Sequence, residues 1–140
     1  MDRKIVIIAD RDWIGESDMR EILFKAKRKD NGEWVVGDLL HTGDVDAVLI
    51  SDCYSQLYRC DSDTICQYTE LTDKNGQKIW ENDILELPGE DGYFVCEWEE
   101  DTARFVMNGD EIIVDFDNYW GYQVEVIGNI FDNEELLEVE

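Results

Sequence analysis

The side chains that could do chemistry in this 140-residue chain are mostly carboxylates. Two acidic groups stand out by their spacing, namely the run at residues 97–101 and the pair Asp115 and Asp117. Paired carboxylates can bind Mg²⁺ or Ca²⁺ or act as general acid and base. However, 35 of the residues are Asp or Glu, so close carboxylates arise by chance, and the pair lacks the Gly and terminal Glu of a calcium loop. We expect these acids to serve structure or solubility.

Four cysteines and a single histidine are the other candidates for metal binding. A zinc site could draw on Cys53, Cys60, Cys66 and His41, but their spacings match no zinc knuckle. No two cysteines form a Cys-x-x-Cys pair, and no secretory signal precedes them. Free thiols in a reducing compartment are therefore the better interpretation. The sequence predicts no catalytic residue, no metal site and no cofactor.

An aromatic segment follows the second acidic pair. Tyr119, Trp120 and Tyr122 lie within four residues, next to Asp115 and Asp117. Exposed Trp and Tyr clusters often anchor protein interfaces, whereas buried ones close a barrel or fill a core. If the segment is exposed, these five residues are the predicted partner-binding surface.

The charge of the chain is large and unevenly placed. The net charge is −23, and residues 79–140 hold 19 acids against one base, Arg104, whereas residues 1–78 hold 16 acids and 11 bases. Such a charge repels nucleic acids and anionic membranes. No apolar run is long enough to span a bilayer. We therefore expect neither a direct nucleic-acid partner nor a membrane.

The segments that must position these residues have the periodicity of strands. From Ile84 onward, about five alternating segments are separated by turn signals such as Asp91-Gly92 and Asn108-Gly109. Strands at this spacing are typical of a small barrel or roll. A short helix is expected after Asp132 or Asn133, with Glu134 and Glu135 in its first turn.

The first half also has strand patterns. Residues 21–27 alternate, and Asn31-Gly32 returns the chain to Trp34, which predicts a hairpin with a basic outer face. Further strands are expected at residues 45–51 and 64–68. Residues 52–63 are polar and are predicted to form a loop with a short helical turn.

Three blocks of sequence, in order along the chain, carry a family resemblance. The first is Met19–Ala26; the second comprises Gln67–Thr69, Leu71, Asp73–Gly76 and Ile79–Ile84; the third comprises Val126–Asn133 and Glu135–Leu137. This pattern resembles the YopX family of phage and prophage proteins. The resemblance implies a mainly β fold with an SH3-like roll in its C-terminal part, and it implies no enzyme activity, cofactor or catalytic residue.

The same resemblance suggests how the chain is divided. Residues 1–18 form an extension outside it, and Met19 is a candidate alternative start. Residues 19–140 form the YopX-like domain, with a hairpin region at 19–67 and the roll at 68–140. In the family pattern a Gly stands at the positions of Glu70 and Asn82, so we expect the local backbone to be affected there.

An apolar run in the extension precedes two aspartates, Asp10 and Asp12. A strand that ends in Asp-x-Asp invites a phosphotransferase or metal hypothesis. No Gly-rich loop or lysine motif follows, and the chain is short for that α/β fold. We therefore expect the apolar run to be a buried strand, and the extension either to add an edge strand or to stay loosely held.

Three functions of different classes fit these observations. The first is a non-enzymatic accessory module that binds a host or phage protein in the bacterial cytoplasm. The alternative is an acidic mimic of nucleic acid that inhibits a host DNA-binding protein. A metal-dependent enzyme is the third and is disfavoured by the missing catalytic set. A homo-oligomer is also open, since a basic hairpin could meet the acidic half of another copy.

Overall fold

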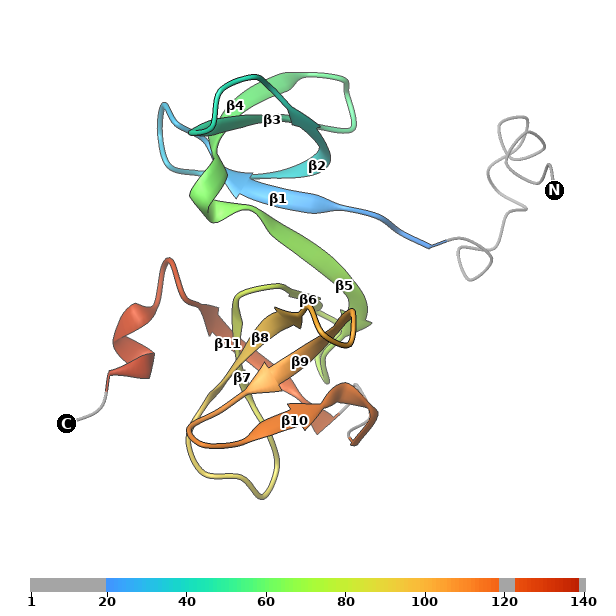
Figure 1. The fold of residues 1–140 in the computed structure, drawn as a ribbon, viewed down its shortest axis with the longest axis vertical. Helices are drawn as coiled ribbons and strands as arrows, with labels where there is room; N and C mark the ends of the chain where they lie inside the picture. Colours follow the sequence, from blue (N-terminus) through green and yellow to red (C-terminus); the bar gives the residue numbers. More distant parts are fainter. Residues whose placement is uncertain (1–19, 119–122, 139–140) are drawn as a thin grey trace, which may run out of the picture.

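The computed structural model describes residues 20–118 and 123–138, and it shows strands arranged as two antiparallel sheets (Figure 1). The predicted mainly β fold with little helix is confirmed. The described residues include the short 3-10 turns η3 (Ser62–Thr64), η4 (Phe116–Asn118) and η6 (Glu134–Leu137). The last of these is the expected short C-terminal helix, a 3-10 turn with Asn133 at its N-cap and Glu134 and Glu135 in its first turn. In this part of the chain, no helix is long and apolar enough to cross a membrane.

The first sheet has the strand order β4-β3-β2-β1-β5-β6. Its strands are β1 (Phe24–Lys27), β2 (Trp34–His41), β3 (Ala47–Ser51), β4 (Leu57–Asp61), β5 (Cys66–Thr72) and β6 (Lys78–Trp80). The predicted hairpin is β1 and β2, turned at Gly32 with a φ of 77°. A bridge between Arg28 and Cys60 brings β4 back to the end of β1, so β1–β4 curl around a small core of their own.

A glycine in β2 contributes to the curl of this half. A Cβ atom on Gly37 would lie 1.9 Å from the carbonyl oxygen of Ser51, so β2 and β3 approach closely only because residue 37 is glycine.

The predicted loop at residues 52–63 was wrong in part, because it contains β4. The expected helical turn within it is η3, and β4 escaped notice because its residues alternate poorly in polarity.

The second sheet has the order β10-β9-β8-β7-β11. Its strands are β7 (Asp83–Glu86), β8 (Phe94–Glu99), β9 (Arg104–Asn108), β10 (Ile113–Asp115) and β11 (Glu125–Asn129). The five strands expected from Ile84 onward are confirmed. Its core includes Leu85, Phe94, Cys96 and Met107, each at most 1% exposed. The SH3-like roll and the division at residues 67 and 68 stay predictions; β5 spans that position.

A third cluster joins the two sheets. Cys66, Tyr68 and Trp80 are buried there, and Leu23, Trp34 and Phe131 pack against them. The strand β5 runs from the first sheet toward the second in Figure 1 and supplies two of these residues. The relative position of the sheets is thus fixed by aromatic side chains from both halves of the sequence.

Candidate functional site

The two aspartates predicted to bind a partner have different surroundings in the structure. Asp115 ends β10, and its carboxylate lies 3.0 Å from the Arg104 guanidinium. Asp117 is exposed in η4, two residues further on. Tyr119, Trp120 and Tyr122 lie outside the described residues. The structure therefore places two of the five predicted residues at one end of β10 and leaves the aromatic part as a prediction.

The other chemical candidates do not converge. Within residues 20–118 and 123–138, no three His, Cys, Asp or Glu side chains come together to hold a metal ion. Cys60 and Cys66 are buried in different clusters, whereas Cys53 and His41 are exposed. Burial raises the pKa of the Cys66 thiol to about 11, so this sulfur is a neutral thiol near pH 7.

The acidic run at 97–101 makes local contacts. Glu97 accepts a hydrogen bond of 3.0 Å from the Asn108 side chain across the β8–β9 pair. Glu99 accepts from Thr102 at 2.5 Å and lies 3.6 Å from Arg104. These carboxylates support the turn between β8 and β9, which is consistent with the structural role expected of them.

The sequence predicted that the basic face of the first hairpin is an outer face. The structure shows that it is not. The ammonium of Lys25 lies 4.5 Å from the ring centre of Trp34 and 5.0 Å from that of Trp80. Lys27 lies over Trp34 as well and pairs with Asp132 from the acidic half of the same chain. The face is covered because the hairpin packs against the aromatic junction between the two sheets.

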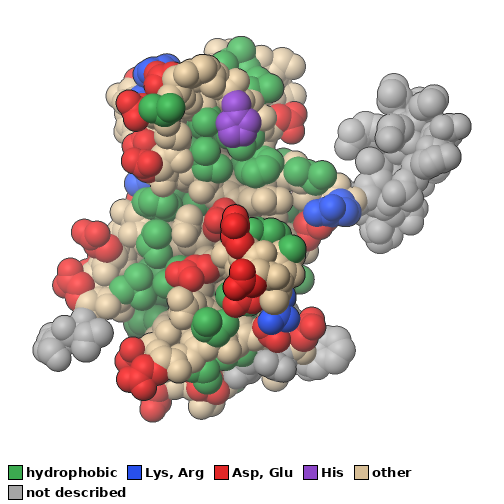
Figure 2. Space-filling view, viewed as in Figure 1, with side chains coloured by type: hydrophobic (Ala, Val, Ile, Leu, Met, Phe, Trp, Pro, Cys, Tyr) green, Lys and Arg blue, Asp and Glu red, His purple; other side chains and the backbone are tan. Residues whose placement is uncertain are grey.

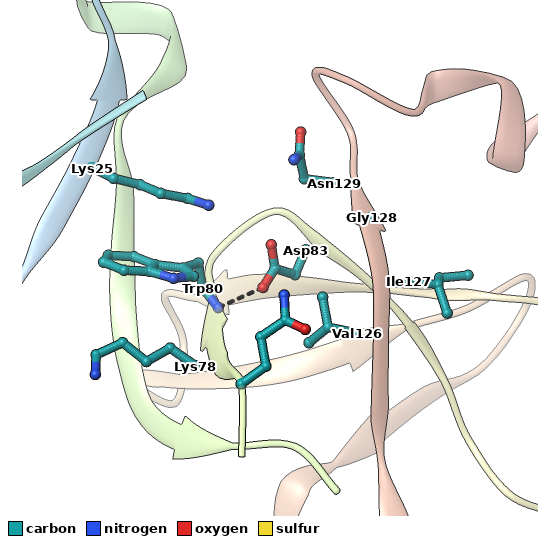
Figure 3. Close-up of a pocket in the computed structure, with 9 residues that line it drawn as sticks. Lys25, Lys78, Trp80, Asp83, Val126, Ile127, Gly128 and Asn129 are labelled. Atoms are coloured by element: carbon teal, nitrogen blue, oxygen red, sulfur yellow. Dashed lines mark hydrogen bonds between the residues drawn. The ribbon is translucent and has the colours of Figure 1, made fainter. Parts of the chain in front are cut away.

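An open pocket of about 560 Å³ lies at this junction (Figure 3). One side is formed by Lys25 of β1 with Lys78 and Trp80 of β6. Residues 126–129 of β11 form the other side, with Asp83 of β7 between them. Figure 3 shows the Lys25 side chain and the Asp83 carboxylate pointing into the space, whereas Ile127 points away.

Asp83 is the acid that lines this pocket. Asp83 is 3% exposed, and its Oδ2 accepts a hydrogen bond of 2.8 Å from the backbone N–H of Trp80. Desolvation raises the pKa of this carboxyl to about 6, against the lowering effects of that hydrogen bond and of Lys25. A buried acid that titrates near neutrality and lines a pocket is the kind of group found at binding and catalytic sites.

Comparison with known proteins decides the family. The family model described as YopX protein matches residues 23–138, which is most of the chain. The chain belongs to the YopX family. No curated protein matches this YopX protein.

A solved structure shares the fold of this YopX protein. The crystal structure of protein EF1440 from Enterococcus faecalis superposes with a TM-score of 0.56 at 21% sequence identity. The match covers 86% of this chain and 100% of the other. At this level of identity the similarity is one of fold.

The three blocks that carry the YopX pattern meet in space. In the first and second blocks, the backbone N–H of Tyr68 donates to the carbonyl of Leu23 (2.9 Å). In the second and third, the N–H of Ile130 donates to the carbonyl of Asn82 (3.0 Å), and that of Val126 to the Asp73 carboxylate (2.9 Å). The pattern therefore marks the junction between the sheets and the walls of the pocket.

The two departures of this YopX protein from the family pattern have a shared backbone geometry. Glu70 and Asn82 both have a φ of 75°, in the left-handed region where glycine is favoured. The strain at Glu70 is accompanied by hydrogen bonds from the Arg20 side chain (3.1 Å) and the Glu21 backbone (2.9 Å) to its carboxylate. Asn tolerates this region better than most residues. The expected effect on the local backbone is thus a positive φ held by non-glycine side chains.

Sequence reasoning missed the pocket of this YopX protein. Lys25 was assigned to a hairpin face, whereas Asp83 entered only within the second block of the family pattern, and the two residues are far apart in the sequence. The available signal was the family pattern itself, since Asp83 and residues 126–129 lie within its second and third blocks.

Proposed function

We propose that this YopX protein is a non-enzymatic module of a phage or prophage that binds a host or phage protein. The proposal rests on one observation, an exposed apolar edge strand. β10 is an edge of the second sheet as described, and its Ile113 side chain is 57% exposed, with Ile112 beside it at 44%. An exposed hydrophobic edge invites pairing with another strand, and soluble proteins usually guard such an edge with Lys, Pro or a covering segment.

The segment around β10 has no such guard in its sequence. Residues 109–118 contain neither Lys nor Pro, and the strand is flanked instead by Asp110, Glu111, Asp115 and Asp117. Figure 2 shows acidic side chains spread over the part of the molecule that holds the second sheet. A partner that adds a strand to this edge would gain main-chain hydrogen bonds, cover the isoleucines and place basic side chains opposite the acids.

Capture from a lysate of the bacterial host tests the proposal. Immobilised full-length protein should retain a defined partner, and Ile113→Lys should lose it because the edge then carries a charge that opposes pairing. Ile22→Lys is the matched control, since Ile22 is 55% exposed but precedes β1. Loss of the partner in both variants, or in neither, would contradict binding at β10.

The acidic nucleic-acid mimic is the second candidate, since residues 79–140 carry 19 acids and one base. It differs from the first in the class of partner and in salt dependence. A mimic should capture a DNA-binding protein, release it when DNA is added, and lose affinity steeply as salt is raised. A strand-pairing partner should be retained when DNA is added and should lose less affinity than a mimic's partner as salt is raised.

A further inference from the structure

We propose that the pocket between β6 and β11 is a binding site for a carboxylate, with the ammonium of Lys25 as its anchor. This site is independent of the proposed function. Its walls come from β1, β6, β7 and β11, whereas β10 lies at the opposite edge of the second sheet from β11.

Lys25 is exceptional among the cations of this acidic chain. Of the nine Lys and Arg residues in the described part, seven form ion pairs with carboxylates, at distances up to 3.7 Å for Lys78 and Glu21. The two that form none are Lys25 and Lys29. Lys29 is exposed after β1, whereas Lys25 lines the pocket. A cation that forms no direct ion pair, in a chain with 35 acids, has the capacity to bind an external carboxylate.

The position of this ammonium is set by its surroundings. It lies over the faces of both Trp34 and Trp80, which hold a cation by electrostatic attraction to the ring. The side chain is thereby oriented into the pocket and partly removed from water (Figure 3). An ion pair formed there is stronger than one on the open surface, since solvent screens it less and little side-chain entropy remains to be lost.

The remaining lining selects for a small monoanion. The Gln77 amide can donate to a carboxylate oxygen, whereas the Lys78 ammonium is paired with Glu21 and the Asn129 amide nitrogen donates to Asp132 at 3.1 Å. The lining includes no Arg to grip a phosphate with two parallel hydrogen bonds. Asp83 opposes a dianion more than a monoanion. The volume of about 560 Å³ suits a small organic acid or the side chain of an acidic peptide.

Replacement of Asp83 is a second test of the proposal, because it should tighten binding whereas replacement of Lys25 should weaken it. Its carboxylate lies beside Lys25 in the pocket and repels an incoming anion when it is ionised. Replacing it by Asn keeps an oxygen that can accept from the Trp80 backbone N–H but removes the charge. Asp83→Asn should therefore tighten carboxylate binding at pH 7.5, whereas removal of the Lys25 charge should abolish it.

Titration of the full-length protein by two-dimensional amide NMR measures the binding. The probes are butyrate, the capped residue acetyl-Glu-amide as a model of an acidic peptide, and inorganic phosphate, and the readouts are the Trp80 indole N–H and the Asn129 side-chain amide. We expect saturable shifts with one or both carboxylate probes, and the stronger of the two identifies a free acid or a peptide as the source. Phosphate should bind at least tenfold more weakly.

Variants make the assignment specific. Lys25→Met and Lys25→Gln should each weaken binding at least tenfold, Lys29→Met should leave it unchanged, and Asp83→Asn should tighten it by threefold or more. Well-dispersed spectra of the variants establish that they fold. Absence of saturable shifts with both carboxylates, preference for phosphate, or equal binding by Lys25→Gln and the wild type would overturn the proposal.

Discussion

The Asp73 carboxylate accepts a hydrogen bond of 2.9 Å from the backbone N–H of Val126, and so joins the turn before β6 to the last strand of the second sheet. Its other oxygen accepts from the N–H groups of Asn75 and Gln77, each at 2.9 Å. The residue is 4% exposed. One buried side chain therefore fixes both the local turn and the position of β11 beside it.

Removing this carboxylate should destabilise the protein strongly. Asp73→Ala leaves three backbone donors without their acceptor, and hydrogen bonds to a charged group contribute about 1.5–3 kcal/mol each when partly buried. We expect a loss of about 3 kcal/mol in the free energy of unfolding, measured by urea denaturation.

Asp52→Ala is the matched control for this change. Asp52 makes the same local turn, with Oδ1 accepting from the N–H groups of Tyr54 and Gln56 at 2.9 Å each, but it has no long-range backbone donor. Its loss should cost about 1 kcal/mol. Equal losses in the two variants would show that the bond to Val126 contributes nothing.

Asp83 should make stability depend on pH in an unusual direction. Its pKa in the folded protein, about 6, is above the ordinary value of 3.8, so the fold favours the protonated form. The relative stabilisation is complete below pH 4 and is lost as the pH rises through 6. Asp83→Asn should therefore raise the free energy of unfolding at pH 8 by about 1–3 kcal/mol and change it little at pH 4. Denaturation at the two pH values checks this, and an effect of the same size at both would contradict it.

Asp132 should act in the opposite sense. Hydrogen bonds from Lys27 and from the Trp34 indole, the latter 2.8 Å long, lower the pKa of its carboxyl to about 2. The stabilisation is complete above pH 4 and is lost as the pH falls through 2. Because the side chain is 39% exposed, solvent screening reduces the effect, and we expect Asp132→Asn to cost about 1 kcal/mol at pH 7.

A double-mutant cycle isolates the contact. Asp132→Asn and Lys27→Met should show a coupling energy of about 0.5 kcal/mol or more at pH 7 that disappears below pH 2. Additive effects at pH 7 would indicate that the ion pair does not connect the two sheets energetically.

At position 70 we expect Gly to give a more stable protein than Ala, which is the reverse of the usual order in a strand. At its φ of 75°, Glu70→Gly should be more stable than Glu70→Ala by about 1 kcal/mol, because a Cβ is disfavoured in the left-handed region. Both variants lose the same carboxylate contacts, so their difference isolates the backbone term. At the exposed residue Asp38 of β2, Ala should be the more stable of the two. Thermal unfolding of the four variants measures both differences.

Local sequence predicted the parts of the fold that local forces determine. The turns at Gly32 and Gly92 have positive φ values, and the strands beside them follow from alternating side chains. β4 was missed because its pairing with β3, and not its own polarity pattern, makes it a strand. The pocket was missed for a related reason, since Lys25 and Asp83 meet only after both sheets have formed.

The charge pattern also predicted only part of the arrangement. The basic residues of the first hairpin suggested a free face for an acidic neighbour, yet Lys27 pairs with Asp132 of its own chain. The composition predicted the attraction but not whether it acts within or between molecules. Lys25 also lies over Trp34 and Trp80 of its own chain, and the homo-oligomer stays a prediction.

The central claim is that β10 offers its edge to a protein partner. Once a partner has been captured and purified, its affinity for the wild type, Ile113→Lys and Ile22→Lys can be measured by calorimetry. We predict that Ile113→Lys weakens binding at least tenfold while Ile22→Lys binds as the wild type does. Equal affinity of the wild type and Ile113→Lys would contradict the account.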